Sequence, residues 1–321
     1  MRVLTTIACI ICSISLASIA NNTLTLQPFP YAWSQQGNAT ELLRSSSQDN
    51  LVNFLSKSEN FTIWPNIHPN VKTDFNPNVT FPSIQGTAFI HPFAIVIGDC
   101  HIGKLVLVAP TAVCRADEGT PIHVGDSSNM QDGVILHALE TTDHGKNMDG
   151  RRFSSNGDRL LGNDSRFSQG YAVFIGDRVS LAHDSMVHGP AWIGNDTFLG
   201  MKSFVFNAKV GNNVAVGVSS LITGGVTIDD DRYVPPGSVI TTQEQADLLP
   251  PRIGSDYEKI NKAVINVNEQ IAGALLAKAY DNQLAQLISQ RESIMEESIL
   301  GSGVNNSNSG SSPNGTSPGI N

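Results

Sequence analysis

Residues 175–205 carry an aliphatic residue at every sixth position when the sequence is divided as IGDRVS LAHDSM VHGPAW IGNDTF LGMKSF V. The spacing recurs over 90–114 and 124–136 and, after a slip of one residue, over 210–240. An α-helix repeats at about 3.6 residues and a strand at about two, so a period of six fits neither. It predicts a parallel β-helix, an all-β solenoid in which three hexapeptides close one triangular coil of about 18 residues.

The segments on either side of the repeat differ from it in composition. The apolar run after Arg2 predicts a secretory signal peptide, with a retained membrane anchor as the alternative, and apolar residues three and four positions apart from Ile260 onward predict a helix. We therefore expect a secreted or surface-associated protein. Its expected parts are a signal peptide at 1–20, an N-terminal extension at 21–84, a β-helix domain at 85–245 with an inserted loop at 142–171, a C-terminal helical segment at 246–300 and a disordered Ser/Gly/Asn-rich tail at 301–321.

The chain is acidic and contains few cysteines. Its 20 Lys and Arg are outnumbered by 29 Asp and Glu, and the formal net charge of −9 argues against nucleic acid as a partner. No segment after the signal peptide approaches the length of a membrane span. Cys9 and Cys12 leave with the signal peptide, so Cys100 and Cys114 remain. Both lie in apolar repeat segments, and we therefore favour buried thiols over a disulfide.

The repeat brings two histidines onto neighbouring coils. His137 and His188 each follow an inward aliphatic residue directly, and with 142–171 looped out they lie one full coil apart. We expect them to stack on one face, about 4.8 Å apart. His183 belongs to the preceding hexapeptide and therefore to another face. It reaches the pair only across the interface of a threefold homotrimer.

Three imidazoles and one water form the open tetrahedral site of a catalytic Zn²⁺. Fe²⁺ and Co²⁺ also suit three imidazoles. The sequence thus predicts a metal site built from His137, His183 and His188 at a subunit interface. Three unrelated surface histidines are the alternative.

Polar residues gather in the same coils. Arg115 and Asp117 are predicted to form an ion pair, either structural or at the trimer interface. Gln131 should lie on the face of His183, because the preceding Met130 is expected to stack on Leu181. Glu140 follows His137 by three residues, where a carboxylate can carry protons between the metal site and bulk solvent. A solvated loop acid is the alternative for Glu140.

Several of these segments resemble the gamma-class carbonic anhydrases, and their motifs occur in the same order on the repeat. The resemblance extends over about 85–270 and is carried by RADEG at 115–119, NMQDG at 129–133, LHALET at 136–141, SLAH at 180–183 and VHGP at 187–190. It implies a trimer of left-handed β-helices with a metal between subunits, and His137, His183 and His188 as its ligands. It also implies that Glu118 and Gln131 hydrogen-bond a metal-bound hydroxide or bicarbonate, that Glu140 is a proton shuttle and that Asn268 lines the active site.

The resulting prediction is an exported, metal-dependent carbonic anhydrase that reversibly hydrates CO2 to bicarbonate. Two features depart from the family pattern: Asn266 stands where the best-known member has Tyr, and the loop after Glu140 is longer and of mixed charge. A hexapeptide-repeat acyltransferase is one alternative, since it shares the fold and uses a His as base. A scaffold that keeps the β-helix without catalysis is another.

Overall fold

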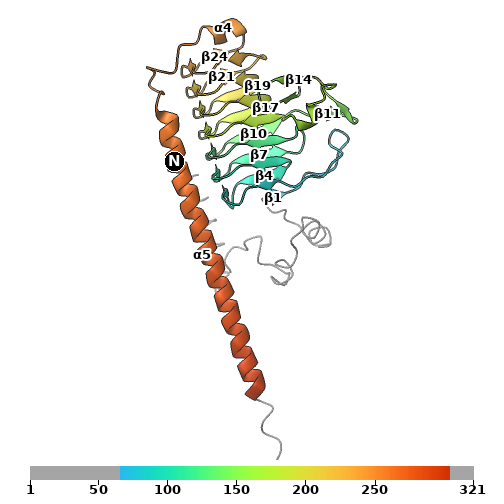
Figure 1. Ribbon diagram of the computed structural model, residues 1–321, viewed down its shortest axis with the longest axis vertical. Coiled ribbons are helices and arrows are strands. Elements are labelled where there is room, and N and C mark those ends of the chain that lie inside the picture. Colours follow the sequence, from blue (N-terminus) through green and yellow to red (C-terminus); the bar gives the residue numbers. More distant parts are fainter. Residues whose placement is uncertain (1–65, 304–321) are drawn as a thin grey trace, which may run out of the picture. The chain divides into compact units, whose positions relative to one another are not determined.

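The computed structural model describes residues 66–303, and its centre is a stack of parallel β-coils with a long helix beside it (Figure 1). The predicted left-handed parallel β-helix with a C-terminal α-helix is confirmed. Each coil contributes one short strand to each of three faces, and successive coils pair strand on strand in parallel. The signal peptide at 1–20, most of the extension at 21–84 and most of the tail at 301–321 lie outside the described residues.

The strands divide among the three faces in a regular order. The first face holds β1 (Ile67–His68), β4 (Ile95–Gly98), β7 (Val113–Ala116), β10 (Ile135–Ala138), β21 (Leu221–Ile222) and β24 (Val239–Ile240). The second holds β2 (Ser83–Ile84), β5 (Cys100–Ile102), β8 (Ile122–Val124), β15 (Val173–Ile175) and β22 (Thr227–Ile228). β17 (Met186–Ile193) and β19 (Phe204–Val210) run through both of these faces. The third holds β3 (Phe89–Ile90), β6 (Leu107–Val108), β9 (Asn129–Met130), β16 (Ser180–Leu181), β18 (Phe198–Leu199), β20 (Ala215–Val216) and β23 (Tyr233–Val234).

The six-residue repeat forms the core of the solenoid. Its aliphatic positions from Val96 to Ile240 are buried, and Ile90 at the start of the repeat is partly buried against them. Burying one such side chain stabilises the fold by about 1.5–3 kcal/mol, so the repeat supplies most of the hydrophobic driving force. The slip of one residue falls at Asn207, opposite Gly189 and Pro190, where β17 carries an extra residue. Asn207 has φ of 50°, a left-handed conformation that Asn tolerates.

One corner of the prism is held by a ladder of Asp and Asn side chains. Each side-chain oxygen accepts a hydrogen bond from a backbone N–H in the preceding coil at 2.6–2.9 Å. The ladder therefore ties consecutive coils together where the chain turns and no strand pairing is available. Its members are Asp126, Asp177, Asn195, Asn212 and Asp230.

The segment expected to loop out at 142–171 has secondary structure of its own. It forms two antiparallel hairpins, β11 (Thr142–Asp143) with β12 (Lys146–Asn147) and β13 (Arg152–Phe153) with β14 (Arg159–Leu160), followed by the 3-10 helix η1 (Phe167–Gln169). A row of outward side chains on the second face meets this insert. Trp192 donates its indole N–H to the Ser155 carbonyl at 3.2 Å, and the Tyr171 ring lies 5.3 Å from the His123 ring.

The solenoid begins before residue 85, the expected boundary. β1 pairs with β4 and β2 pairs with β5, so residues from 67 onward already belong to the first coil. Ile84, six residues before Ile90, continues the repeat and packs against the core, whereas Ile67 lies outside that six-residue phase. After β24 the chain forms the short helix α4 (Gln243–Asp247), whose capping box joins Thr242 and Gln245.

The long helix α5 (Ile260–Gly303) begins close to the predicted start and packs on the third face, against β3, β6 and β16. Its buried residues Asn261, Ile265 and Ala272 face the solenoid, and Asn261 donates a hydrogen bond to the Arg178 carbonyl at 2.9 Å. Among the described residues, no helix is both long and apolar enough to cross a membrane.

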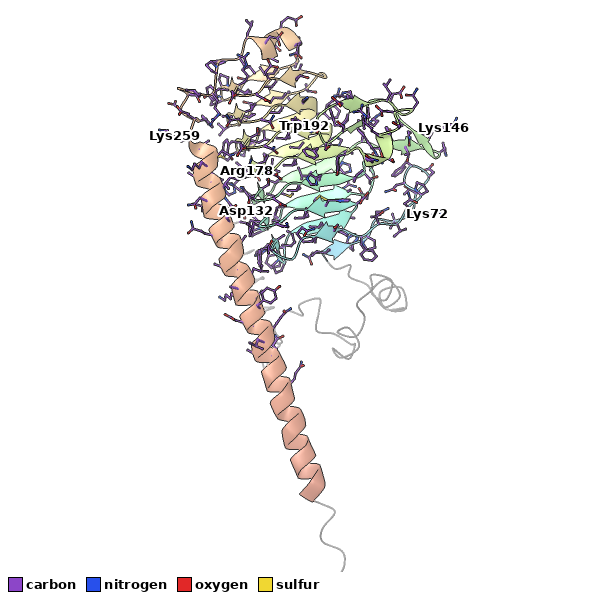
Figure 2. The ribbon with its side chains drawn as sticks, in the orientation of Figure 1. Lys72, Asp132, Lys146, Arg178, Trp192 and Lys259 are labelled. Atoms are coloured by element: carbon purple, nitrogen blue, oxygen red, sulfur yellow. A yellow bond between two sulfur atoms is a disulfide. The ribbon has the colours of Figure 1, made fainter. Side chains whose placement is uncertain are left out.

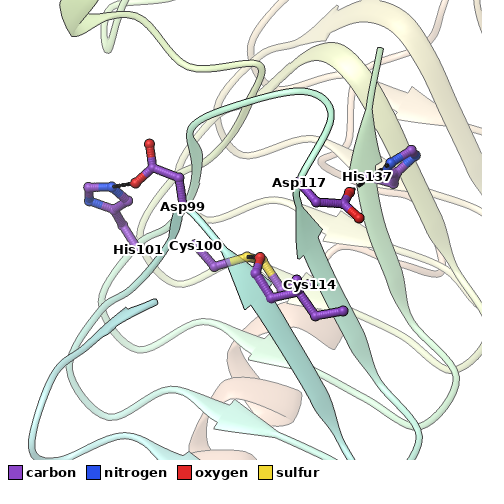
Figure 3. Close-up of a disulfide and its surroundings, with 7 residues drawn as sticks. Asp99, Cys100, His101, Cys114, Asp117 and His137 are labelled. Carbon is purple, nitrogen blue, oxygen red and sulfur yellow. Dashed lines mark hydrogen bonds and ion pairs between the residues drawn. A yellow bond between two sulfur atoms is a disulfide. The ribbon is translucent and has the colours of Figure 1, made fainter. Parts of the chain in front are cut away.

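Cys100 and Cys114 form a disulfide, which corrects the expectation of two buried thiols (Figure 3). Both side chains point into the solenoid from different faces, and their Cα atoms lie 6.5 Å apart, within the range that a disulfide spans. The repeat phase places Cys114 inside. Cys100 lies two residues before the inward Ile102 and is inside because alternate residues of a strand share a face.

Candidate metal centre

The predicted pairing of His137 and His188 is confirmed by the strand register. β10 and β17 align Leu136 with Val187 and His137 with His188. The two imidazole rings have centroids 5.0 Å apart, and Nδ1 of His137 lies 3.2 Å from Nε2 of His188. Since the preceding residues are buried in the core, the backbone fixes both rings on the outer surface of the first face.

The end of β7 places three charged side chains beside His137. Arg115 binds the Asp117 carboxylate through both oxygens at 2.8 and 2.9 Å, so the predicted ion pair is present within one chain. Asp117 Oδ1 lies 3.6 Å from His137 Nε2 (Figure 3), and Glu118 Oε2 lies 3.4 Å from the same atom. Burial alone would raise the pKa of Asp117, but His137 and Arg115 outweigh it and lower that pKa to about 2. Asp117 is therefore a fixed negative charge at neutral pH.

His188 is held as a neutral imidazole with a defined tautomer. Its Nδ1 lies 3.0 Å from the Gly189 carbonyl oxygen, which can only accept a hydrogen bond, so Nδ1 carries the proton. Burial, and to a lesser degree His137, lowers the pKa of His188. The lone pair is consequently on Nε2, the atom that faces His137.

His183 lies at the corner after β16, on the face of α5. Leu181 pairs with Met130, as predicted, so Gln131 and Asp132 are the coil neighbours of Ala182 and His183. His183 Nδ1 lies 3.1 Å from Asp132 Oδ2. Figure 2 shows Asp132 on the side of the solenoid that faces α5, away from Lys146 on the inserted hairpins.

A cavity of about 500 Å³ lies between this corner and α5. Its polar lining includes Gln131, His183 and Asn268, which the sequence had assigned to one site. Asn268 donates a hydrogen bond from Nδ2 to the Val264 carbonyl at 2.8 Å, an arrangement that directs its amide along the helix. Apolar residues of α5, among them Val264 and Ile271, and of the third face, among them Phe89 and Leu107, line much of the rest.

The imidazole nitrogens suit a divalent metal. Nε2 of His137 is buried and makes no hydrogen bond among the described residues. His188 and His183 both engage Nδ1 with an oxygen, the arrangement that directs Nε2 of a metal-binding histidine toward the metal, and Nε2 of His188 here lies 3.2 Å from Nδ1 of His137. The three histidines do not meet within one chain, and residues 66–303 contain no group of three or more His, Cys, Asp or Glu arranged to hold a metal.

Two contacts in this region were not anticipated from the sequence. The contact of Asp132 with His183 could have been predicted from the sequence. The two residues follow the paired Met130 and Leu181 by the same number of positions. Arg151, whose Nη2 lies 3.5 Å from Glu140 Oε1, carried no such signal because it lies in the aperiodic insert. His101 and His123 lie side by side on the paired strands β5 and β8, next to Tyr171.

Comparison with known proteins identifies the family. The chain is 45% identical over 232 residues, 72% of its own length and 87% of the relative's, to a carbonic anhydrase of Methanosarcina thermophila. The chain belongs to the gamma-class carbonic anhydrases. It is also 38% identical over 215 residues to the carboxysome assembly protein CcmM of Nostoc, although this covers only 35% of that protein.

Solved structures also match the chain at lower identity. A putative acetyltransferase from Bacillus cereus superposes with a TM-score of 0.42 at 22% identity, covering 61% of this gamma-class chain and 94% of that structure. No family model matches the chain.

Proposed function

We propose that the protein reversibly hydrates CO2 at a divalent metal held between two copies of the chain. His137 and His188 of one copy and His183 of a neighbour supply the imidazoles. The main support is that His137 and His188 are paired in register on one face. His183 lies on another face, beside the Asp132 carboxylate. Three imidazoles and an open position are the donor set of a catalytic zinc. Zn²⁺ is the default, and Fe²⁺ or Co²⁺ fits the same donors.

An apolar column on the first face supports a complex of several copies. Outward side chains align from coil to coil, and Ile95 and Val239 at its two ends are 39% and 56% exposed. Soluble monomers rarely expose an apolar surface of such length, and this one runs directly beside His137 and His188. A threefold arrangement of copies covers the column and brings His183 to the pair. The column consists of Ile95, Val113, Ile135, Met186, Phe204, Leu221 and Val239.

A divalent metal held by His137, His188 and His183 would supply hydroxide at neutral pH and a Lewis acid for the reaction. The chain's own side chains then orient the reacting groups and transfer the proton. Glu118 lies beside His137 and accepts a hydrogen bond from the reacting group, while Gln131 donates from the other side of the interface. Asn268 lines the apolar cavity through which CO2 arrives. Glu140 passes the released proton to solvent.

We further propose that the protein is exported and acts outside the cell. The apolar segment after Arg2 motivates this. The Cys100–Cys114 disulfide is consistent with it, since disulfides persist in oxidising compartments.

Mixed assemblies test the site between copies. His183→Ala and His188→Ala are each expected to lose metal and CO2 hydration. When both variants are co-expressed in equal amounts, random trimers regain about a quarter of the intact sites, because one copy supplies His183 and its neighbour supplies the pair. Metal analysis after anaerobic purification and stopped-flow hydration measure the recovery.

The control is His144→Ala in the insert, which is exposed and should keep full activity. If the mixed assemblies recover neither metal nor activity while each variant remains folded, the site does not lie between copies. If wild-type protein binds metal but does not hydrate CO2, the result would instead favour a non-catalytic scaffold. Acetyl transfer by wild-type protein would favour an acyltransferase.

A further inference from the structure

The insert at 142–171 brings two consecutive arginines against the chain that follows His137. Arg152 donates from Nη2 to Thr141 Oγ1 and from Nη1 to the Phe167 carbonyl, both at 3.1 Å. Its guanidinium carbon lies 4.8 Å from the centre of the Phe167 ring. Burial lowers the pKa of Arg152 to about 10, which still leaves it charged at neutral pH. Arg152 therefore ties the insert to Thr141, the residue that follows Glu140.

Arg151 is directed at Glu140 itself. Its Nη2 lies 3.5 Å from Glu140 Oε1, with side-chain exposures of 23% and 30%. Nη1 of Arg151 is buried and makes no hydrogen bond among the described residues. The Glu140 carboxylate is thus the side-chain group that this guanidinium faces, and the backbone of Arg151 is held by a hydrogen bond from its N–H to the Met148 carbonyl.

We propose that Arg151 is a positioning residue that holds the Glu140 carboxylate in place for proton transfer. This rests on the proposed function, in which Glu140 is the shuttle. A guanidinium has no acceptor and does not titrate in the working range, so it orients a carboxylate without competing for the proton. The ion pair is made to Oε1, and Oε2 makes no hydrogen bond among the described residues, so Oε2 can take up and release the proton. Fixing the carboxylate raises the fraction of time it spends in a transferring geometry.

Steady-state kinetics separate this role from a structural one. In Arg151→Ala we expect kcat at low buffer concentration to fall about three- to fivefold, the effect of losing one partly exposed ion pair. kcat/KM for CO2 should not change, because CO2 is converted before the proton leaves. Arg151→Lys should recover most of kcat, and a small buffer such as imidazole should abolish the difference. Arg166→Ala is the matched control, since Arg166 pairs with Asp158 and Asp164 within the insert.

A second readout needs no metal. Thermal unfolding of metal-free wild type, Glu140→Ala, Arg151→Ala and the double variant forms a double-mutant cycle. If the two side chains interact, the midpoint shifts are not additive, and the double variant resembles the singles. Additive shifts would overturn the contact.

The outcomes distinguish this proposal from the one on which it rests. Unchanged low-buffer kcat in Arg151→Ala, with a buffer-dependent loss in Glu140→Ala, overturns only the role of Arg151. A loss of kcat/KM as large as the loss of kcat also overturns it, because the variant then damages the site. A wild-type protein that does not hydrate CO2 refutes both proposals.

Discussion

The Cys100–Cys114 disulfide gives a prediction whose size follows from the chain. The two cysteines are 14 residues apart in sequence, and a cross-link closing a loop of this length removes denatured-state entropy worth about 3 kcal/mol. We therefore expect the double variant Cys100→Ala/Cys114→Ala to unfold about 6–12 °C below oxidised wild type, given roughly 2–4 °C per kcal/mol for a domain of this size. Both sulfurs are fully buried, and this adds a smaller loss of packing.

The measurement is calorimetry or circular dichroism at matched protein concentration, since subunit association makes the midpoint concentration-dependent. Wild type unfolded with a reductant present is the control, and it should approach the double variant because the cross-link is then absent from the denatured chain. Equal midpoints for oxidised wild type and the double variant would refute the reasoning. So would two free thiols in denatured, non-reduced protein by mass spectrometry.

Three further predictions concern the site and the insert. Glu140→Ala should lower kcat at low buffer by about 10²-fold, with partial rescue by small buffers, and unchanged turnover would exclude the shuttle. Gly189→Ala should destabilise the protein by about 1–3 kcal/mol in denaturant unfolding and reduce metal content, because a Cβ there would lie 2.3 Å from the Ala172 carbonyl oxygen beside His188. The hydrogen bond to Asp99 raises the pKa of His101 against a smaller opposing effect of burial, so the stabilisation is present below the usual pKa of histidine and lost as pH rises through the raised value. Asp99→Asn should thus destabilise more at pH 5.5 than at pH 9, by less than about 1 kcal/mol, and an equal effect at both pH values would contradict the assignment.

Much of the candidate site could be predicted because the repeat converts sequence position into spatial position. A residue that directly follows an inward aliphatic residue lies on the outer surface of its face. Its counterpart one coil away lies on the outer surface of the same face. This rule alone pairs His137 with His188 and puts Gln131 in the coil next to His183. The buried aliphatic residues set the register, because a shift of one residue would turn them out of the core.

The rule does not apply where the period stops or where contacts cross the interior. Arg151 meets Glu140 through two hairpins whose register depends on their turns, and no six-residue phase links the two residues. The period assigns Cys114 to the interior but does not say which inward side chains of other faces it meets. The roles of the three histidines stay predictions, because a period describes one chain and the proposed site needs two.

The coil step limits how the length of such a chain can change. On the first face, Val96 pairs with Cys114 and Val187 with Val205, each pair 18 residues apart. An insertion of one or two hexapeptides between His137 and His188 would rotate every later residue to a different face and separate the two histidines, whereas a one-residue difference is absorbed at a corner, as at Asn207 opposite Gly189 and Pro190. Length changes are therefore tolerated in whole coils or as excursions that leave the stack and return in phase. The insert at 142–171 is of the second kind, and it adds a surface beside Glu140 without disturbing the alignment of His137 and His188.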